Sequence, residues 1–242
     1  MNSRIQNRII IAFLLVVWSV GAPQATNAQS EHGFRFVRIR YEEAGNGWGR
    51  RNWGPFWRHD YPTAEENLRE AIERTTLLRV ESQSIVLTLK DEEIFEYPIL
   101  YLCEPGHWLM DEEEGLNLRK YFDRGGFVLF DDFAGRDWQN FYFNIKQVFP
   151  EKEPVLLDPD HPVWTIYYDI DPVQAPSIKG RDRFDDQYYA LFDDNGRMMF
   201  LACYNQDIGD GWEHPFGRRV LAEASTVSFQ MGINFIIYAL TH

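Results

Sequence analysis

Three groups of polar side chains in this sequence have the residue types for acid–base chemistry or cation binding. Asp131 and Asp132 follow the apolar run 127–130. A second group follows the apolar run 198–204 and comprises Asn205, Asp207, Asp210, Trp212 and Glu213. A third lies in the Gly- and Pro-rich stretch 44–62 and comprises Arg50, Arg51, Trp53, Trp57, Arg58, His59 and Asp60. Carboxylates serve as general acids and bases, and clustered carboxylate oxygens suit a hard divalent cation.

These groups should meet at one place, because open parallel sheets bind ligands outside the carboxyl ends of their strands and each group follows an expected strand. The candidate catalytic residues are Asp131, Asp132 and Glu213, and the candidate metal ligands are Asp131, Asp132, Asp207 and Glu213. The candidate ligand-binding residues are Arg50, Arg51, Trp53, Trp57, His59, Asp60, Asn205, Asp207 and Trp212. A divalent cation is the one cofactor that these residues suggest. In the alternative interpretation, Asp131 and Asp132 cap the following helix and pair with Arg136 or the Arg50–Arg51 pair.

The aromatic and histidine residues have structural as well as functional interpretations. Four tryptophans could stack on a sugar or simply pack within loops: Trp48, Trp53, Trp57 and Trp212. His59 and Asp60 resemble half of a catalytic pair, but adjacent side chains rarely point at each other, so His59 could instead be solvated or paired with an arginine. His161 lies in the turn 158–162, where a structural role is expected, and His107 could overhang the site.

The elements that must position these residues alternate between strands and helices. Strands are expected at 34–41, 77–81, 98–103, 127–130 and 198–204. Helices are expected from Thr63, from the capping box that begins at Asp111, over 136–149 and near the C-terminus. Residues 205–217 are expected to be a loop, and the turn-rich segment 150–195 an insertion packed on a single domain that covers 29–242. Such alternation predicts βαβ units and a mainly parallel sheet.

The first 28 residues have the features of a secretory signal peptide. Arg4 and Arg8 precede the apolar stretch 9–20, Pro23 ends that stretch, and Ala28 offers a small residue for cleavage. A membrane-spanning helix needs about 20 apolar residues, so the mature chain is expected not to span a membrane. We therefore expect an exported protein, periplasmic or extracellular, with an uncleaved N-terminal anchor as the alternative.

Charge and cysteine content restrict the possible partners. The net charge is −13, which argues against a general nucleic-acid binder. Residues 29–58 carry six arginines against three glutamates, so this basic region could receive an anion or neutralise the protein's own carboxylates. Cys103 and Cys203 both follow apolar runs and are expected to be buried free thiols.

A series of motifs resembles a known bacterial family. YPILYLCEPGHWLMDEEEGLNLRKYFDRGGFVLFDDF is followed by VFP, DHPVW, YNQDIGDGWE and GINFIIYAL, in an order similar to the domain-of-unknown-function family 4159. That resemblance implies a class I glutamine-amidotransferase-like fold, which is a flavodoxin-like three-layer α/β sandwich with a mainly parallel sheet. In such folds the strand after a Gly-Gly pair delivers a nucleophilic cysteine. Here Gly125-Gly126 is followed by FVLF and then by Asp131-Asp132, so glutamine amidotransferase activity is rejected.

Two functions remain open from the sequence. The first is an exported, non-catalytic module that binds a small ligand or an envelope protein, with the amidotransferase nucleophile replaced by Asp. The second is a metal- or carboxylate-assisted hydrolase that acts on an extracytoplasmic substrate. A structural subunit of an envelope complex is a plainer possibility, and a large exposed aromatic patch would be its expected sign.

If the strand order is 2-1-3-4-5, the strand that ends at Phe130 separates the strands of Cys103 and Cys203. The two sulfurs are then too far apart for a disulfide.

Overall fold

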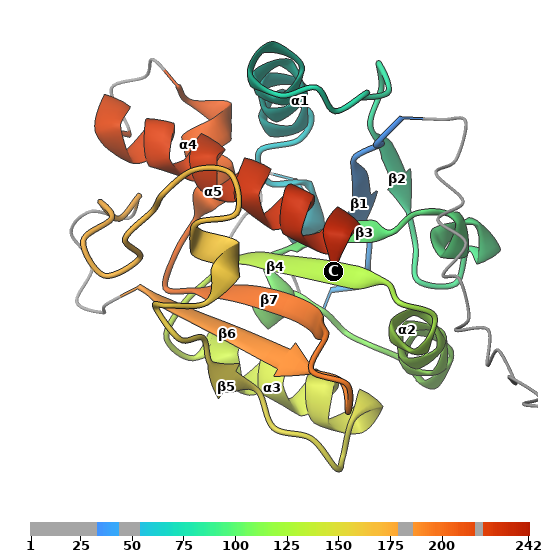
Figure 1. Cartoon of the computed structure of the whole chain (residues 1–242). Coiled ribbons are helices and arrows are strands. Elements are labelled where there is room, and N and C mark those ends of the chain that lie inside the picture. The colour runs from blue at the N-terminus through green and yellow to red at the C-terminus, as the bar shows by residue number, and fades with distance from the viewer. Residues whose placement is uncertain (1–32, 44–53, 179–185, 216–219) are drawn as a thin grey trace, which may run out of the picture. The chain divides into compact units, whose positions relative to one another are not determined.

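A mixed seven-stranded sheet in the order β2-β1-β3-β4-β7-β6-β5 forms the centre of the protein (Figure 1). The computed structural model describes residues 33–43, 54–178, 186–215 and 220–242. The strands are β1 (Val37–Ile39), β2 (Ile85–Leu87), β3 (Ile99–Cys103), β4 (Phe127–Phe133), β5 (Val155–Leu156), β6 (Gln187–Phe192) and β7 (Met198–Tyr204). The first five strands of this order pair in parallel, whereas β6 is antiparallel to β7 and β5 is antiparallel to β6.

Helices cover both faces of the sheet, with α1 (Thr63–Thr75) and α5 (Ala222–Thr241) on one face and α2 (Glu112–Asp123) and α3 (Asp137–Val148) on the other (Figure 1). The remaining α-helix is the short α4 (Ile208–Glu213), and the 3-10 helices are η1 (Phe56–Arg58), η2 (Glu92–Glu96), η3 (Pro105–His107) and η4 (Pro162–Trp164). None of the helices in the described ranges combines the length and apolar character that a membrane crossing requires.

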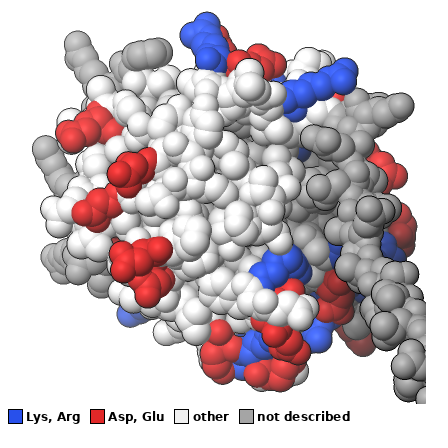
Figure 2. All heavy atoms as spheres, viewed as in Figure 1, with Lys and Arg blue, Asp and Glu red and all other residues white. Residues whose placement is uncertain are grey.

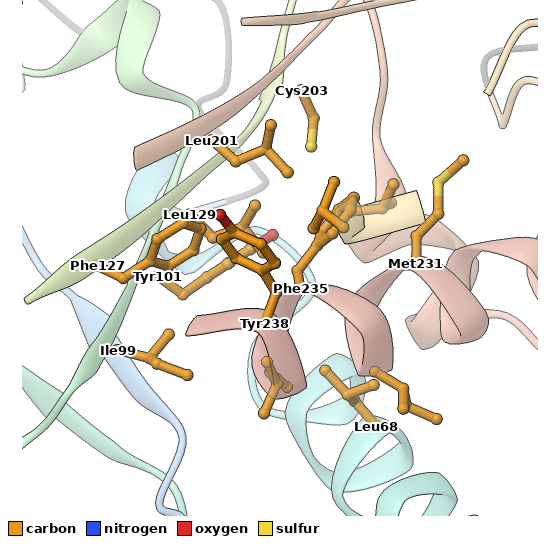
Figure 3. Close-up of a cluster of buried hydrophobic side chains, with 14 of the residues drawn as sticks. Leu68, Ile99, Tyr101, Phe127, Leu129, Leu201, Cys203, Met231, Phe235 and Tyr238 are labelled. Atoms are coloured by element: carbon orange, nitrogen blue, oxygen red, sulfur yellow. The ribbon is translucent and has the colours of Figure 1, made fainter. Parts of the chain in front are cut away.

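Two hydrophobic cores lie on the two sides of the sheet, because alternate residues of a strand point to opposite faces. On β3, Ile99, Tyr101 and Cys103 belong to the core beneath α1 and α5, whereas Leu100 and Leu102 belong to the core beneath α2 and α3. Figure 3 shows part of the first core, where Tyr101 and Leu129 from the sheet lie near Phe235 and Tyr238 of α5. All five residues of β3 are buried, as expected for a strand covered on both faces.

The parallel strands have the order expected from the sequence. β4 lies between β3 and β7, so it separates Cys103 from Cys203, and both cysteines are buried free thiols. The expected capping box of α2 is also confirmed: Asp111 accepts the backbone N–H of Glu114, and the Glu114 side chain accepts that of Asp111. The expected helices from Thr63 and over 136–149 correspond to α1 and α3.

Four local expectations differ from the structure. Residues 77–81 form only the single bridge of Val80 to Phe34, and the second strand is instead 85–87, which offers three consecutive apolar residues to β1. Residues 150–195 are not only packed against the sheet, because β5 and β6 join it. The expected loop 205–217 contains α4, whose first turn is capped by Asp207. β4 continues to Phe133, so Asp131 and Asp132 are part of the strand.

Some expectations concern residues outside the described ranges. These are the signal segment 1–28 and the site candidates Arg50, Arg51 and Trp53, together with Trp48.

Candidate carboxylate–histidine site

Six carboxylates gather at the carboxyl ends of β3 and β4, and four of them lie beside His59: Asp60, Glu104, Asp132 and Asp210. We call all six the acidic cluster, and its members are Asp60, Glu104, Asp131, Asp132, Asp207 and Asp210. Glu104 directly follows β3, and the register of β3 with β4 pairs Cys103 with Asp131. His59 and Asp60 follow η1, and α4 adds Asp210 from beyond β7. The sheet topology therefore brings four separate parts of the chain together at the carboxyl ends of the strands.

His59 is held between carboxylates on both sides of its ring. Its Nδ1 lies 2.6 Å from Asp132 Oδ2 and 3.2 Å from Glu104 Oε1, and its Nε2 lies 3.5 Å from Asp60 Oδ1. Burial alone would lower the pKa of His59, but hydrogen bonds to Asp132, Cys103 and Glu104 and the charge of Asp60 together outweigh it and raise the pKa above the ordinary histidine value. The ring remains 23% exposed, so it can be reached from outside.

Asp131 attaches the start of α4 to the sheet. It accepts hydrogen bonds from the Tyr101 hydroxyl at 2.9 Å and from the backbone N–H groups of Ile208 and Gly209 at 3.2 and 2.9 Å. Burial, reinforced by the Asp132 charge, raises the pKa of Asp131 to about 6. Because its oxygens already have these donors, Asp131 acts as a helix-capping residue, as the alternative interpretation of the sequence proposed, but it caps α4 rather than α3.

Asp60 is a buried member of the acidic cluster whose carboxylate lacks hydrogen-bond donors among the described residues. Its side chain is completely buried. Its backbone adopts φ 64°, a left-handed conformation in which Asp and Asn are several-fold enriched among non-glycine residues. Burial raises the pKa of Asp60 to about 8. A buried carboxylate without hydrogen-bond donors is costly, and the nearby charges of His59 and Arg38 offset only part of that cost, so a proton or a bound cation would stabilise it further.

The carboxylates on α4 have different exposures. Asp207 is buried and caps α4 by accepting the N–H of Asp210 at 3.0 Å, and burial raises its pKa well above the ordinary value. The Asp210 side chain is 27% exposed, and burial raises its pKa as well. Glu213 lies farther along α4, where its carboxylate is 3.0 Å from His214 Nε2. The outer edge of the acidic cluster therefore consists of Asp210 and the ring of His59.

A buried ion pair that the sequence analysis missed fixes the segment before His59. Arg38 on β1 pairs with Glu65 of α1 and donates hydrogen bonds of 2.9 Å to the backbone carbonyls of Trp57 and His59. Both charged side chains are almost completely inaccessible. The available signal was Glu65, because it lies beside Ala64, Leu68 and Ile72 on the apolar side of α1.

Several candidate residues have structural positions rather than positions in the acidic cluster. Trp212 is buried in the core, where its Nε1 donates to the Ser228 carbonyl. Asn205 accepts the N–H of Gly135 at 3.3 Å. Trp57 is half-buried. His161 caps η4 by accepting the Val163 N–H. His107 stacks on Phe56 with ring centroids 3.6 Å apart, and its Nε2 lies 3.6 Å from Glu104 Oε2, so this ring borders the acidic cluster.

Cys103 lies beside the acidic cluster but has the properties of an unreactive thiol. Its sulfur, a ring nitrogen of His59 and a carboxylate oxygen of Asp132 lie within 4.8 Å of one another. The thiol is completely buried, and burial raises its pKa well above the ordinary value. The thiolate needed for nucleophilic attack is therefore disfavoured.

A cavity of about 300 Å³ lies near the acidic cluster without including it. Its lining includes Phe34, Tyr61, Glu65, Arg69 and Ser84. Since no member of the acidic cluster lines this cavity, a ligand would meet the cluster from the exposed side of His59 and Asp210.

Comparison with known proteins identifies a family but no activity. A family model described as "Domain of unknown function (DUF4159)" matches residues 35–240, a range that includes every residue of the acidic cluster. No curated protein matches the chain.

Proposed function

Because the chain belongs to DUF4159, whose description assigns no reaction, we propose a function from the site itself: a hydrolase that uses the acidic cluster and His59 on an extracytoplasmic substrate. The observation that carries this proposal is the position of the His59 ring between Asp132 and Asp60 at the carboxyl ends of parallel strands. Groups with strongly shifted pKa values that gather at such an edge are candidates for catalysis.

The proposed chemistry follows from the properties of these groups. Hydrolysis needs a group that accepts a proton from water and one that stabilises the developing charge. His59 and Asp210 are the partly exposed members of the site and could contact a substrate, whereas Asp132 positions the His59 ring through Nδ1. Asp131 is assigned no catalytic role, since its oxygens hold Tyr101 and the start of α4.

The fold relationship is part of the proposal. The order of the parallel strands and the helices on both faces of the sheet support a flavodoxin-like, class I glutamine-amidotransferase-like fold. Within that relationship, Asp131 and Asp132 occupy the place of the nucleophilic cysteine, so amidotransferase chemistry remains rejected.

Asp132→Asn tests the hydrolase. The purified protein is assayed against chromogenic carboxylic esters, phosphate esters and glycosides, with Asp194→Asn as the matched control because its side chain is 93% exposed on the β6–β7 turn. Loss of the carboxylate that orients His59 is expected to lower kcat/KM on the responsive substrate class by about 100-fold or more. Equal activity of the two variants would contradict the assignment.

A non-catalytic binding module is the second candidate, and one observation favours it. The face over α5 carries few charged side chains at its centre, which suits contact with a protein partner (Figure 2). A thermal-shift screen against nucleotides and envelope glycans, followed by capture from envelope extracts, tests this candidate. A ligand at 100 times its Kd adds about 2.7 kcal/mol of stability, which is readily detected. Binding without turnover of any ester or glycoside would favour the module over the hydrolase.

A further inference from the structure

We propose that His59 Nε2, Asp60 and Asp210 bind one divalent transition-metal cation. A ring nitrogen of His59 and a carboxylate oxygen from each aspartate lie within 4.8 Å of one another, and Nε2 is 3.5 Å from Asp60 Oδ1. Ligands about 2.1 Å from a shared ion are at most about 4.2 Å apart, so small side-chain movements suffice to bring all three onto one ion. This inference deepens the proposed hydrolase and rests on it for the role of the cation.

The carboxylate of Asp60 supplies an independent reason for a cation. It is fully buried and faces the acidic cluster, yet neither oxygen receives a hydrogen bond from the described residues. Its Oδ2 lies against the start of α4, since a Cβ on Gly209 would be 2.6 Å from it. A bound dication would compensate the charge that the protein leaves without a donor.

The two nitrogens of His59 have separate roles in this arrangement. Nδ1 is engaged by Asp132 at 2.6 Å, where it donates its proton to that carboxylate, and Nε2 faces Asp60 and is the nitrogen that would exchange its proton for the ion. A carboxylate behind the imidazole is the common arrangement around protein metal sites. The hydrogen bond from Arg38 to the His59 carbonyl holds the backbone at the same residue. Asp132 is therefore a positioning residue in this site.

The ligand types select the class of cation. An imidazole nitrogen with two carboxylates suits Zn²⁺, Mn²⁺, Fe²⁺ or Co²⁺ better than Ca²⁺, which takes oxygen ligands. Asp210 is 27% exposed and His59 23%, so the ion would have an open side for water or substrate. A bound cation would lower the pKa of a coordinated water, which could then supply the nucleophile of the proposed hydrolase.

Two other ligand sets are close enough to be distinguished by experiment. His59, Cys103 and Asp132 would use the opposite nitrogen, but Asp132 already lies at hydrogen-bond distance from that nitrogen. Asp210, Glu213 and His214 form a half-exposed set on α4 that does not involve Asp60.

Asp60→Asn tests the site directly. The full-length protein is stripped with a chelator and titrated with ZnCl₂ and MnCl₂ by calorimetry, with Asp194→Asn as the control. One equivalent per chain is expected for the wild type and the control, whereas Asp60→Asn should lose at least 100-fold in affinity. Asn tolerates the left-handed backbone of residue 60, and removing the buried charge should leave the melting temperature of the stripped protein equal or higher. Loss of binding therefore cannot be attributed to unfolding.

Further variants make each outcome decisive. Asp132→Asn should weaken binding about 10- to 100-fold, as expected for a residue that orients a ligand, and Cys103→Ala and His214→Asn should leave it unchanged.

Absence of binding to the stripped wild type, or equal binding by Asp60→Asn, would overturn the proposal. Loss of binding in Cys103→Ala or in His214→Asn would assign the ion to the corresponding other set. Binding without hydrolysis would overturn only the hydrolase, and hydrolysis that persists in chelator would overturn only the metal site.

Discussion

At the scale of single residues, Gly209 determines how closely α4 can approach the sheet. A Cβ at this position would lie 2.6 Å from Asp60 Oδ2 and 2.9 Å from the Tyr101 hydroxyl. The same residue donates its N–H to Asp131 at 2.9 Å. A side chain here would therefore separate Asp131 from its donors, in addition to its steric cost.

Gly209→Ala is expected to lower the free energy of unfolding by about 1–3 kcal/mol, as overpacking of a buried site does. Urea unfolding monitored by circular dichroism measures the change. Gly115→Ala is the matched control, because this residue lies within α2 and a Cβ there would meet only the flexible end of Met110 at 3.3 Å. The control is expected to be neutral or slightly stabilising, since Ala has the higher helix propensity. Equal destabilisation of the two variants would contradict the role given to Gly209.

The sequence predicted part of the site, and the part that it missed has a physical reason. Asp131 and Asp132 could be located because they follow a buried apolar run. The different roles of Asp131 and Asp132 could not be predicted. The hydrogen-bond donors to Asp131 come from β3 and α4, whereas Asp132 contacts His59. Hydrogen bonds between residues distant in sequence leave no local pattern.

At the scale of elements, prediction succeeded where a local rule determines the structure. The capping box of α2 and the apolar run of β3 are complete within their own segments. β2 and β5 were missed because they have only three and two residues and depend on their neighbours for pairing. α4 was missed because two of its six residues are glycine, which suggests a loop. Gly211 is required there because a Cβ would lie 2.5 Å from the Ser228 hydroxyl oxygen.

The short helix η4 provides a pH-dependent contribution to stability. Its cap, His161, accepts the N–H of Val163 through Nδ1, which requires the neutral ring. Burial is the main reason that the pKa of His161 is lowered below its ordinary value of 6.5. Nearby His242 lowers this pKa further, by more than Asp158 raises it. The unfolded chain then binds a proton more readily than the folded protein. The contribution of His161 is therefore complete above pH 6.5 and is lost as the pH falls through the folded-state pKa.

His161→Asn tests this contribution, because Asn retains a capping oxygen but does not titrate. The free energy of unfolding of the wild type and the variant is measured between pH 7.5 and 5. The advantage of the wild type is expected to shrink as the pH falls, whereas the titration of all other groups cancels in the difference. A difference that is constant or grows toward pH 5 would contradict the lowered pKa.

At the scale of the whole molecule, the two cores and the sheet between them make both cysteines inaccessible. Cys103 and Cys203 lie on either side of β4 and belong to the core beneath α1 and α5. Both are fully buried, and burial raises the pKa of each thiol well above its ordinary value.

We expect a thiol reagent to modify neither cysteine of the native protein and both cysteines in denaturant without reductant. Mass spectrometry of the labelled chain counts the modifications. Labelling in denaturant that appears only after reduction would indicate a disulfide and would contradict the strand order. Rapid labelling of the native protein would contradict the burial of the thiols.

The antiparallel pair β6–β7 has a consequence for the folding kinetics. Its strands are joined by the turn at Asp193–Arg197, where Asp193 accepts the N–H groups of Asn195 and Arg197, so this hairpin closes over very few residues. β7 must also pair in parallel with β4, from which residues 134–197 separate it. Contacts between residues close in sequence form faster than contacts that close long loops. The β6–β7 hairpin is therefore expected to form before the β4–β7 pairing, and Asp207 and Asp210, which follow β7, to join the rest of the acidic cluster only when β7 has paired with β4.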